Sequence, residues 1–309
     1  MAGITLIEYA KTVQNDLDRG VVETFASGSP ILGMLPFRDV KEGAISYLQE
    51  DTLPGIAFRN VNGSYTPGSG IVNPLVEKVK ILGGEIDTDI ALIRRFGMER
   101  RTTDITMKVK ASARYFDKIF IDGDELTTIG QFDGMNKRLT GTQLVHMDGA
   151  GTVGGALSEN GIDRLIDAID GSPDILIMGK KCYRQLKNLF KGSTILAFGE
   201  PNYFGFRPPT FSGIPLGILD KDNSNNVILD FDETEGSSSG TAASMYALKF
   251  GVDSYLCGIQ SASPLGKDLG EISSAPVYRY RLDWDCGVAL FHPRCAARLC
   301  GILAASGVL

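Results

Sequence analysis

Residues 37–82 limit the possible folds more than any other segment, because glycines and prolines interrupt it repeatedly. Strand-like stretches at 44–48 and 76–82 flank a turn-rich region at 60–73. Two such stretches separated by turn residues predict a long two-stranded ribbon. A ribbon of this kind is marginally stable alone in water, so we expect a neighbouring molecule to support it. Its turn-forming residues are Gly43, Gly55, Gly63, Gly68, Gly70, Pro54, Pro67 and Pro74.

The strongest helical pattern lies at residues 98–121. It contains two apolar stripes, which predicts a helix packed between two layers. The sequence Asp122-Gly123-Asp124 predicts where this helix ends. The first stripe consists of Ile105, Val109, Ala113, Phe116 and Phe120, and the second of Met107, Ala111, Tyr115 and Ile119.

The other segments alternate irregularly between helices and strands, which predicts an α+β fold and not regular βαβ units. Further helices are expected at 3–18, at 159–170 with Ser158 as N-cap, and at 179–191 with Cys182, Leu186, Leu189 and Phe190 facing inward. Strands are expected at 174–178, 194–198, 214–219, 227–231, 245–250 and 277–291, a mobile loop at 233–239, and an apolar tail from Ala296.

The composition disfavours several classes of protein. A net charge of −6 argues against a dedicated nucleic-acid reader. No apolar run reaches the length of about 18 residues needed to span a bilayer, and the N-terminus lacks a secretory pattern. With His146 and His292 as the only histidines, we expect no catalytic site, cofactor or metal site. The cysteines form no CxxC pair and are expected to be free buried thiols, with a disulfide between subunits as the alternative.

Two local patterns resemble functional motifs, one for cofactor binding and one for acid–base catalysis. The sequence Gly149-Ala150-Gly151-Thr152-Val153-Gly154 matches the dinucleotide-binding motif GxGxxG, but no helix is expected to open directly on its last glycine. A glycine-rich connection is therefore the preferred interpretation. Asp283 and Asp285 share a strand face with Arg279 and Arg281, which favours salt-bridged strand charges over an acid–base pair.

Five short motifs occur in order along the chain. They are Leu35-Pro36-Phe37 leading through residues 50–59 to 61–65, then residues 83–89, then 120–124 with 132–135, then 211–215, and finally 287–293 with Ala296 and Leu299. In this order and spacing they resemble the major capsid proteins of tailed bacteriophages, which have the Hong Kong 97 fold. The resemblance covers essentially the whole chain.

This resemblance implies a division into five parts: an N-terminal arm (1–36), an extended loop (37–82), a peripheral domain with its spine helix (83–160), an axial domain (161–262) and a peripheral return strand (263–309). It also implies self-assembly into hexamers and pentamers of an icosahedral head that encloses double-stranded DNA. The expected partners are a portal, a separate scaffolding protein and, as an optional addition, a decoration protein, without any membrane. Assembly is expected in the host cytoplasm and the final location in the virion.

The chain departs from some members of that family in two respects. Certain members join their subunits through a Lys–Asn isopeptide bond, with the asparagine late in the chain. Here the last asparagine is Asn226, so a bond from Lys41 lacks that acceptor and we expect a non-covalent shell. Other members carry a long N-terminal scaffolding segment, whereas this sequence reaches the arm at once.

The basic residues around the long helix are the candidate contact residues. Residues 94–118 contain eight basic residues against three acidic ones. These residues could form ion pairs between subunits, contact the phosphates of packaged DNA without sequence preference, or do both. The candidates are Arg59 in the extended loop and Arg94, Arg95, Arg100, Arg101, Lys108 and Arg114.

Three other functions remain open at this stage. An encapsulin-type nanocompartment shares the fold but encloses enzyme cargo. A soluble enzyme would bind a dinucleotide at residues 149–154. A different virion part, such as a tail tube, would assemble as a helical stack.

Overall fold

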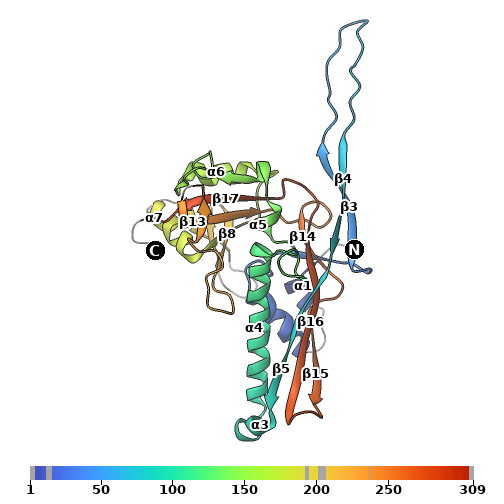
Figure 1. Ribbon diagram of the computed structural model, residues 1–309, viewed down its shortest axis with the longest axis vertical. Coiled ribbons are helices and arrows are strands. Elements are labelled where there is room, and N and C mark those ends of the chain that lie inside the picture. The colour runs from blue at the N-terminus through green and yellow to red at the C-terminus, as the bar shows by residue number, and fades with distance from the viewer. Residues whose placement is uncertain (1–3, 12–15, 192–194, 201–206, 237, 306–309) are drawn as a thin grey trace.

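The molecule is elongated, with a two-stranded ribbon projecting from one end and a short helix, α3 (Ile90–Phe96), at the other (Figure 1). A six-stranded and a nine-stranded sheet lie between them. Among the described residues, no helix is long and apolar enough to cross a membrane. This computed structural model describes residues 4–11, 16–191, 195–200, 207–236 and 238–305.

The long axis of the molecule is built from helix α4 (Glu99–Asp122) and two strands beside it, β5 (Lys80–Asp89) and β16 (Val277–Leu290) (Figure 1). The two strands pair antiparallel along their length. Side chains alternate across a strand, so every second residue from Tyr280 to Cys286 is buried, whereas residues 286–289 are all buried. The predicted helix at 98–121 and the predicted long strand at 277–291 are both confirmed.

The charged residues of β16 form ion pairs across the sheet. Arg279 Nε donates to Asp87 Oδ1 over 2.7 Å, and Arg281 Nε donates to Glu85 Oε1 over 2.9 Å. Asp283 lies 4.0 Å from Arg281. The prediction of salt-bridged strand charges is therefore confirmed for the two arginines, whose main partners are Asp87 and Glu85 of β5 and not the aspartates of β16.

The six-stranded sheet runs β1-β2-β14-β16-β15, with β5 also paired to β16. Strand β2 is parallel to β14, whereas β14, β15 and β5 are antiparallel to β16. The bounds of its other strands are β1 Ile4–Thr5, β2 Pro36–Asp39, β14 Leu256–Gln260 and β15 Leu265–Glu271.

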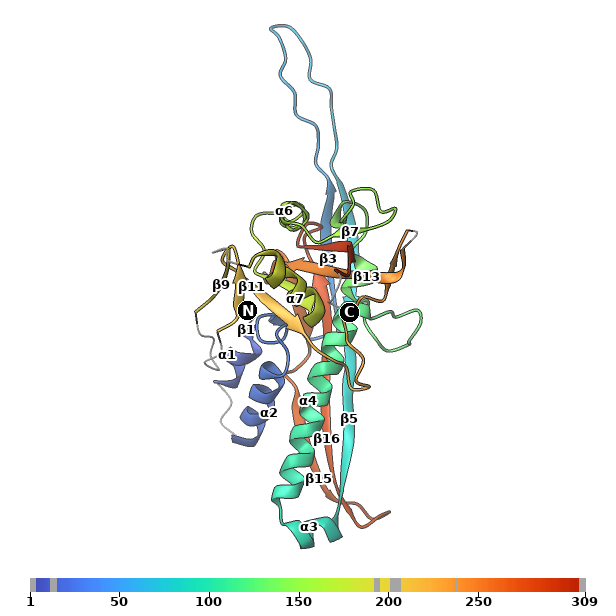
Figure 2. The ribbon, with the colours of Figure 1, turned by 90° about the vertical axis from the view of Figure 1, so that its left-hand side faces the viewer.

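The N-terminal segment forms two helices, α1 (Leu6–Ala10) and α2 (Asp16–Ser27). Helix α2 lies beside α4, and α1 packs against α2 (Figure 2). The helix predicted at 3–18 is found only in part: Ile4 and Thr5 form β1, residues 3 and 12–15 lie outside the described residues, and α2 continues to Ser27. Thr5 is the N-cap of α1. Its side-chain oxygen accepts a hydrogen bond from the Glu8 amide, and the Glu8 carboxylate accepts one from the Thr5 amide.

The largest core contains the only tryptophan, Trp284 of β16. Its ring lies 5.3 Å from each of three phenylalanine rings: Phe25 of α2, Phe37 of β2 and Phe116 of α4. Its Nε1 donates to Gln260 Oε1 over 3.2 Å, which satisfies the buried polar group. The N-terminal helices are thus part of the chain's own core.

A buried polar contact joins the turn after α2 to the long helix. Ser29 donates its hydroxyl proton to Asp117 of α4, and the Leu32 amide donates to Ser29 Oγ over 3.0 Å. Asp117 is 4% exposed. Burial raises its pKa to about 8, and the Ser29 bond opposes this shift only in part.

The two apolar stripes of α4 have different surroundings. The first stripe is confirmed as the buried face, with Val109, Phe116 and Phe120 in the core. The second stripe is largely exposed, because Met107 and Tyr115 lie on the side of α4 that faces solvent and only Ile119 is buried. The prediction that two layers sandwich the helix is therefore wrong for this side.

The nine-stranded sheet runs β6-β17-β13-β8-β11-β10-β9, with β12 paired to β13 and β7 to β17. Helices α6 (Glu159–Asp167) and α7 (Lys180–Leu189) pack against it. Ser158 caps α6 as predicted, by accepting from the Gly161 amide. The strand bounds are β6 Leu144–His146, β7 Gly155–Ala156, β8 Ile175–Gly179, β9 Leu196–Phe198, β10 Pro209–Phe211, β11 Ile214–Leu219, β12 Glu233–Glu235, β13 Ser238–Leu248 and β17 Ala296–Leu303.

Four expectations for this part of the chain are wrong. Residues 227–231 form only an isolated bridge from Val227 to Lys221 and not a strand, although Leu229 and Phe231 are buried. The segment expected to be a mobile loop contains β12, which Glu233 ties to Arg298 over 2.9 Å. Leu189 is 46% exposed, because it lies at the last turn of α7 and not on its inner face. The expected tail is strand β17, which pairs with β13 and not with the sheet of β16.

The remaining described elements are the two-stranded sheet of the ribbon and two short helical segments that follow α4 in the chain. Their bounds are β3 Ala44–Thr52 and β4 Ile71–Lys78, α5 Met135–Arg138, and the 3₁₀ turn Gly141–Gln143.

Candidate functional site: the extended ribbon and the basic helix face

The ribbon of β3 and β4 carries apolar side chains that no other described part of the chain covers. The strands pair antiparallel from Ala44 opposite Lys78 to Thr52 opposite Ile71, and residues 53–70 form the tip. Figures 1 and 2 show the tip projecting far beyond the rest of the molecule. Exposed apolar patches of this kind mark sites of interaction. The apolar tip residues are Leu53, Ile56, Phe58, Val61 and Tyr65, of which the least exposed, Tyr65, has 64% of its surface in solvent.

The base of the ribbon is fixed to the body of the molecule. Arg138 of α5 forms a two-pronged ion pair with Glu77 of β4, in which Nη2 and Oε2 lie 2.8 Å apart. The ring of Tyr47 packs 4.7 Å from that of Phe291. Burial raises the pKa of Tyr47 to about 12, and the nearby Glu77 carboxylate adds to the shift. The ribbon therefore leaves the body in a defined direction.

Arg59 lies at the tip and helps to shape it. Its guanidinium lies 5.2 Å from the centre of the Tyr65 ring, and its Nη1 donates to the Gly63 carbonyl over 3.3 Å. Between them, Asn62 adopts a positive φ of 67°, which asparagine tolerates better than most residues. Arg59 thus closes a turn and still presents its charge to solvent.

The structure separates the basic residues of α3 and α4 into different environments. Arg94 and Arg95 are exposed in the last turn of α3, and Arg114 is exposed on α4. Arg100 pairs with Asp104 over 3.1 Å on the same helix. Lys108 is half-buried, and its side chain packs against the backbone of Gly84 in β5.

Arg101 differs from the other candidates because it is buried. Its Nη2 forms an ion pair with Asp268 of β15, and its guanidinium lies 5.1 Å from the centre of the Tyr278 ring. Only 8% of the residue is exposed. Within the subunit, Arg101 is thus covered by β15 and β16, and its contact with another molecule stays a prediction.

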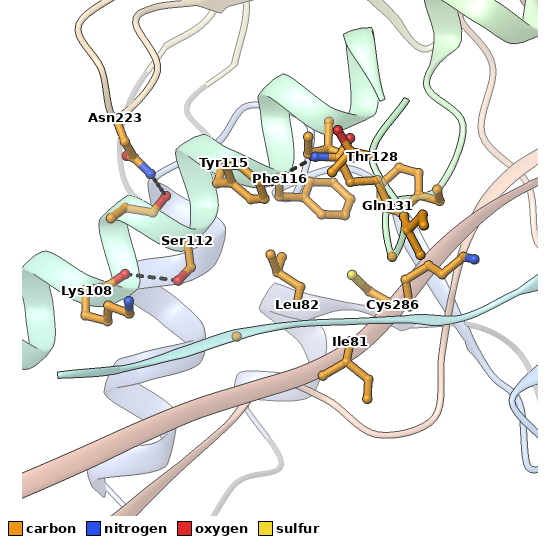
Figure 3. A pocket seen from close by; sticks show the side chains of 17 residues that line it. Ile81, Leu82, Lys108, Ser112, Tyr115, Phe116, Thr128, Gln131, Asn223 and Cys286 are labelled. Carbon is orange, nitrogen blue, oxygen red and sulfur yellow. Dashed lines mark hydrogen bonds between the residues drawn. The ribbon is translucent and has the colours of Figure 1, made fainter. Parts of the chain in front are cut away.

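A pocket of about 480 Å³ lies between α4, β5 and the loop at 128–132 (Figure 3). Two bonds fix its walls: Gln131 Nε2 donates to Tyr115 Oη and Asn223 Nδ2 to the Ala111 carbonyl, both over 2.9 Å. Burial raises the pKa of the Cys286 thiol in its wall, so this sulfur is a poor nucleophile. The described lining contains no carboxylate or histidine that could act as a base.

The glycine-rich sequence at 149–154 folds around the carboxylate of Asp148. The amides of residues 150–154 all donate to this carboxylate, over distances from 2.6 to 3.3 Å. Backbone bonds from Val153, Gly151 and Thr152 hold the pKa of Asp148 well below its ordinary value. Helix α6 begins only at Glu159. The predicted glycine-rich connection is confirmed. The backbone amides that could bind a phosphate already donate to the Asp148 carboxylate.

All five cysteines are buried and unbridged, as expected. Their positions are Cys182, Cys257, Cys286, Cys295 and Cys300.

No protein-family model matches the sequence, and no curated protein matches it. Solved structures do match. The encapsulin of the holo-SrpI complex from Synechococcus elongatus PCC 7942 gives a TM-score of 0.62 at 14% identity, covering 89% of this chain and 88% of that one. The capsid of a native GTA particle gives 0.61 at 12%, covering 90% of both chains.

A third match comes from Mycobacterium phage Bobi, with a TM-score of 0.58 at 12% identity over 88% of this chain and 90% of that one. The chain has the Hong Kong 97 capsid fold. The fold predicted from the five sequence motifs is therefore confirmed. The division into five parts and the contacts made by the basic residues stay predictions.

Proposed function

We propose that this chain is the major capsid protein of a tailed bacteriophage, which assembles into hexamers and pentamers of an icosahedral head around double-stranded DNA. The proposal depends on one observation above all: the apolar tip of the ribbon projects away from the body and is exposed with respect to all described residues. In this proposal the chain is a structural protein without catalysis, located in the virion.

The energetics of the ribbon support a neighbouring copy as its partner. Burying an apolar side chain of this size stabilises an assembly by about 1.5–3 kcal/mol. A two-stranded ribbon that remains in water gains none of this. In a closed shell the tip of every copy would contact a neighbour, and every copy would be contacted by the tip of another. A modest contact is thus repeated around the whole particle.

The exposed basic residues give the shell a second proposed contact. Arg94, Arg95, Arg100 and Arg114 carry their charges at or near the surface of α3 and α4, with Lys108 partly covered. Contacts between such charges and DNA phosphates need no base sequence, which suits a container. Ion pairs with the next subunit are the other proposed role of the same residues. A portal, a separate scaffolding protein and a decoration protein are the further proposed partners, with assembly in the host cytoplasm.

Electron microscopy of the purified chain tests the proposal. We expect polyhedral shells or capsomers, whereas monodisperse monomers at every salt concentration would contradict it. Deletion of residues 56–72 should leave a folded monomer that cannot close shells, because the body keeps both its sheets. The matched control is Phe58→Tyr, which keeps an aromatic ring at the tip and should assemble normally. Normal shells from the deletion variant would also contradict the proposal.

The shell is proposed to be held without covalent links between subunits. Boiling purified shells in detergent should release a single band at the monomer mass of 33.3 kDa. A ladder of larger species would show cross-linked subunits and refute this part of the proposal.

An encapsulin-type nanocompartment is the second candidate, favoured by the match to the Synechococcus elongatus shell. The glycine-rich loop at 37–82 and the absence of a recognisable cargo-docking sequence favour the phage head. Neighbouring genes distinguish the two. Genes for a large terminase and a portal would support the phage head, whereas a gene for a peroxidase or ferritin-like cargo would support the nanocompartment.

A further inference from the structure

Three side chains of different chemistry converge on one side of the nine-stranded sheet: His146 of β6, Glu235 of β12 and Cys300 of β17. Cys300 Sγ lies 3.2 Å from His146 Nδ1 and 3.6 Å from Glu235 Oε1, and Nδ1 contacts Oε1 directly. Parallel pairing of β6 with β17 places Cys300 opposite His146. The cluster is therefore built by strand pairing and not by a chance meeting of flexible side chains.

The arrangement does not suit a catalytic triad. In a thiol–imidazole–carboxylate triad, the nucleophile and the carboxylate contact opposite ring nitrogens, so that a proton can be held across the ring. Here both Cys300 Sγ and Glu235 Oε1 approach the same nitrogen, Nδ1 of His146. Both partners therefore compete for one ring nitrogen, and the three possible ligand atoms all lie within 4.8 Å of one another.

The geometry and the donor set point to a divalent metal ion. Imidazole nitrogen, thiolate sulfur and carboxylate oxygen are the ligand atoms of zinc, which binds them at about 2.0–2.3 Å. Tetrahedral ligands at those lengths lie about 3.3–3.6 Å apart, close to the separations of Sγ from its two partners. Nδ1 and Oε1 lie closer together than this, so an ion would replace their direct contact and move these two side chains apart. We infer that His146, Glu235 and Cys300 bind a divalent cation of the zinc class.

Two glycines give the ligands room to approach. Gly151 has a φ of +70°, and a Cβ there would lie 2.8 Å from the His146 ring. Gly301 has a φ of +76°, and a Cβ there would lie 2.9 Å from Glu235 Cγ. Cys300 and Glu235 are largely buried, whereas the His146 side chain is 31% exposed, which leaves an approach for the ion and for water as a fourth ligand.

A bound cation would act as a structural clamp. It would link β12 to the two strands β6 and β17. Without the ion, β12 pairs with β13 in the sheet, and β6 pairs with β17. Because the ion binds the folded arrangement and not the unfolded chain, its binding free energy adds to stability. This role is independent of whether the shell encloses DNA or protein cargo.

Cobalt titration of untagged, chelator-treated protein tests the site. We expect saturation at a single ion per chain, with visible bands typical of tetrahedral cobalt and a thiolate-to-cobalt absorption in the near ultraviolet. Cys300→Ser should abolish the thiolate absorption and weaken binding by at least about tenfold. Cys182→Ser is the matched control, since it removes an equally buried thiol from α7 and should change neither property.

Zinc should also raise the melting temperature of the wild-type protein and leave that of His146→Ala unchanged. Circular dichroism establishes that each variant is folded, and Glu235→Gln replaces Cys300→Ser if the latter misfolds. The absence of a thiolate absorption in the wild-type protein would overturn the inference. Equal cobalt affinity in the wild-type protein and the ligand variants would overturn it as well, because the ion would then be bound elsewhere.

Discussion

Asp117 makes the stability of this protein depend on pH in an unusual direction. The carboxyl group is buried between α4 and the turn after α2, where Ser29 donates to it. Burial raises its pKa to about 8 from an unfolded value near 3.8. Asp117→Asn keeps the shape of the side chain and an oxygen that can accept from Ser29, but it removes the ionisation.

The sign and size of the effect follow from proton binding. Between about pH 4 and pH 8 the folded state binds one proton more than the unfolded state at this site. The free energy of unfolding therefore falls as pH rises, by at most about 1.4 kcal/mol per pH unit for one group. The stabilisation is fully present below the unfolded pKa and is lost as pH rises through the folded pKa. Over about pH 6 to 8 the expected loss is about 2 kcal/mol.

Urea denaturation of dissociated subunits, followed by the fluorescence of Trp284, measures this dependence. Trp284 is the only tryptophan, and its ring lies 5.3 Å from that of Phe116, the residue before Asp117. We expect the unfolding free energy of Asp117→Asn to fall less steeply with pH than that of the wild-type protein. The control Asp283→Asn removes the same charge from a side chain that is 57% exposed and should keep the wild-type slope. Equal slopes for the wild-type protein and Asp117→Asn would refute the reasoning.

Two further substitutions test the core and the glycine-rich loop. Phe25→Ala removes a fully buried ring from the Trp284 cluster and should lower the free energy of unfolding by about 3–5 kcal/mol, whereas Phe58→Ala at the exposed tip should change it by less than about 0.5 kcal/mol; equal effects in thermal melts would contradict the assigned burial. Asp148→Ala removes the acceptor shared by the amides of residues 150–154 and should speed their hydrogen exchange; unchanged protection would show that other bonds hold the loop.

Much of the fold could be predicted because many signals in this chain are local. The spacing of its apolar residues and the Asp-Gly-Asp sequence at its end predict the helix at 99–122. Strand β16 was predicted to within one residue of its observed end, since apolar and polar residues alternate over much of its length. Ser158 was identified as a helix cap from its place before an amphipathic run. Each of these signals depends on neighbours within about one or two helical turns.

The candidate site could be predicted only in part, because burial of a charge depends on distant partners. Arg101 looks like Arg100 and Arg114 in the sequence, yet it is buried because Asp268, 167 residues away, lies against it. The metal-ligand cluster gave no sequence signal either. His146 and Glu235 are separated by 89 residues, and Cys300 follows 65 residues later, so no short motif contains two of them.

The sequence by itself determined the ribbon, the long helix and the long strand, since turn residues and apolar periodicity are properties of a short stretch of chain. Only the tertiary structure decided that residues 296–303 leave the sheet of β16 and join β13 as a strand of the other sheet. It also decided which charges of α4 face solvent and which are paired inside the molecule. The physical reason is that periodicity within a segment determines which of its faces is apolar. The residues that cover this face come from distant parts of the sequence.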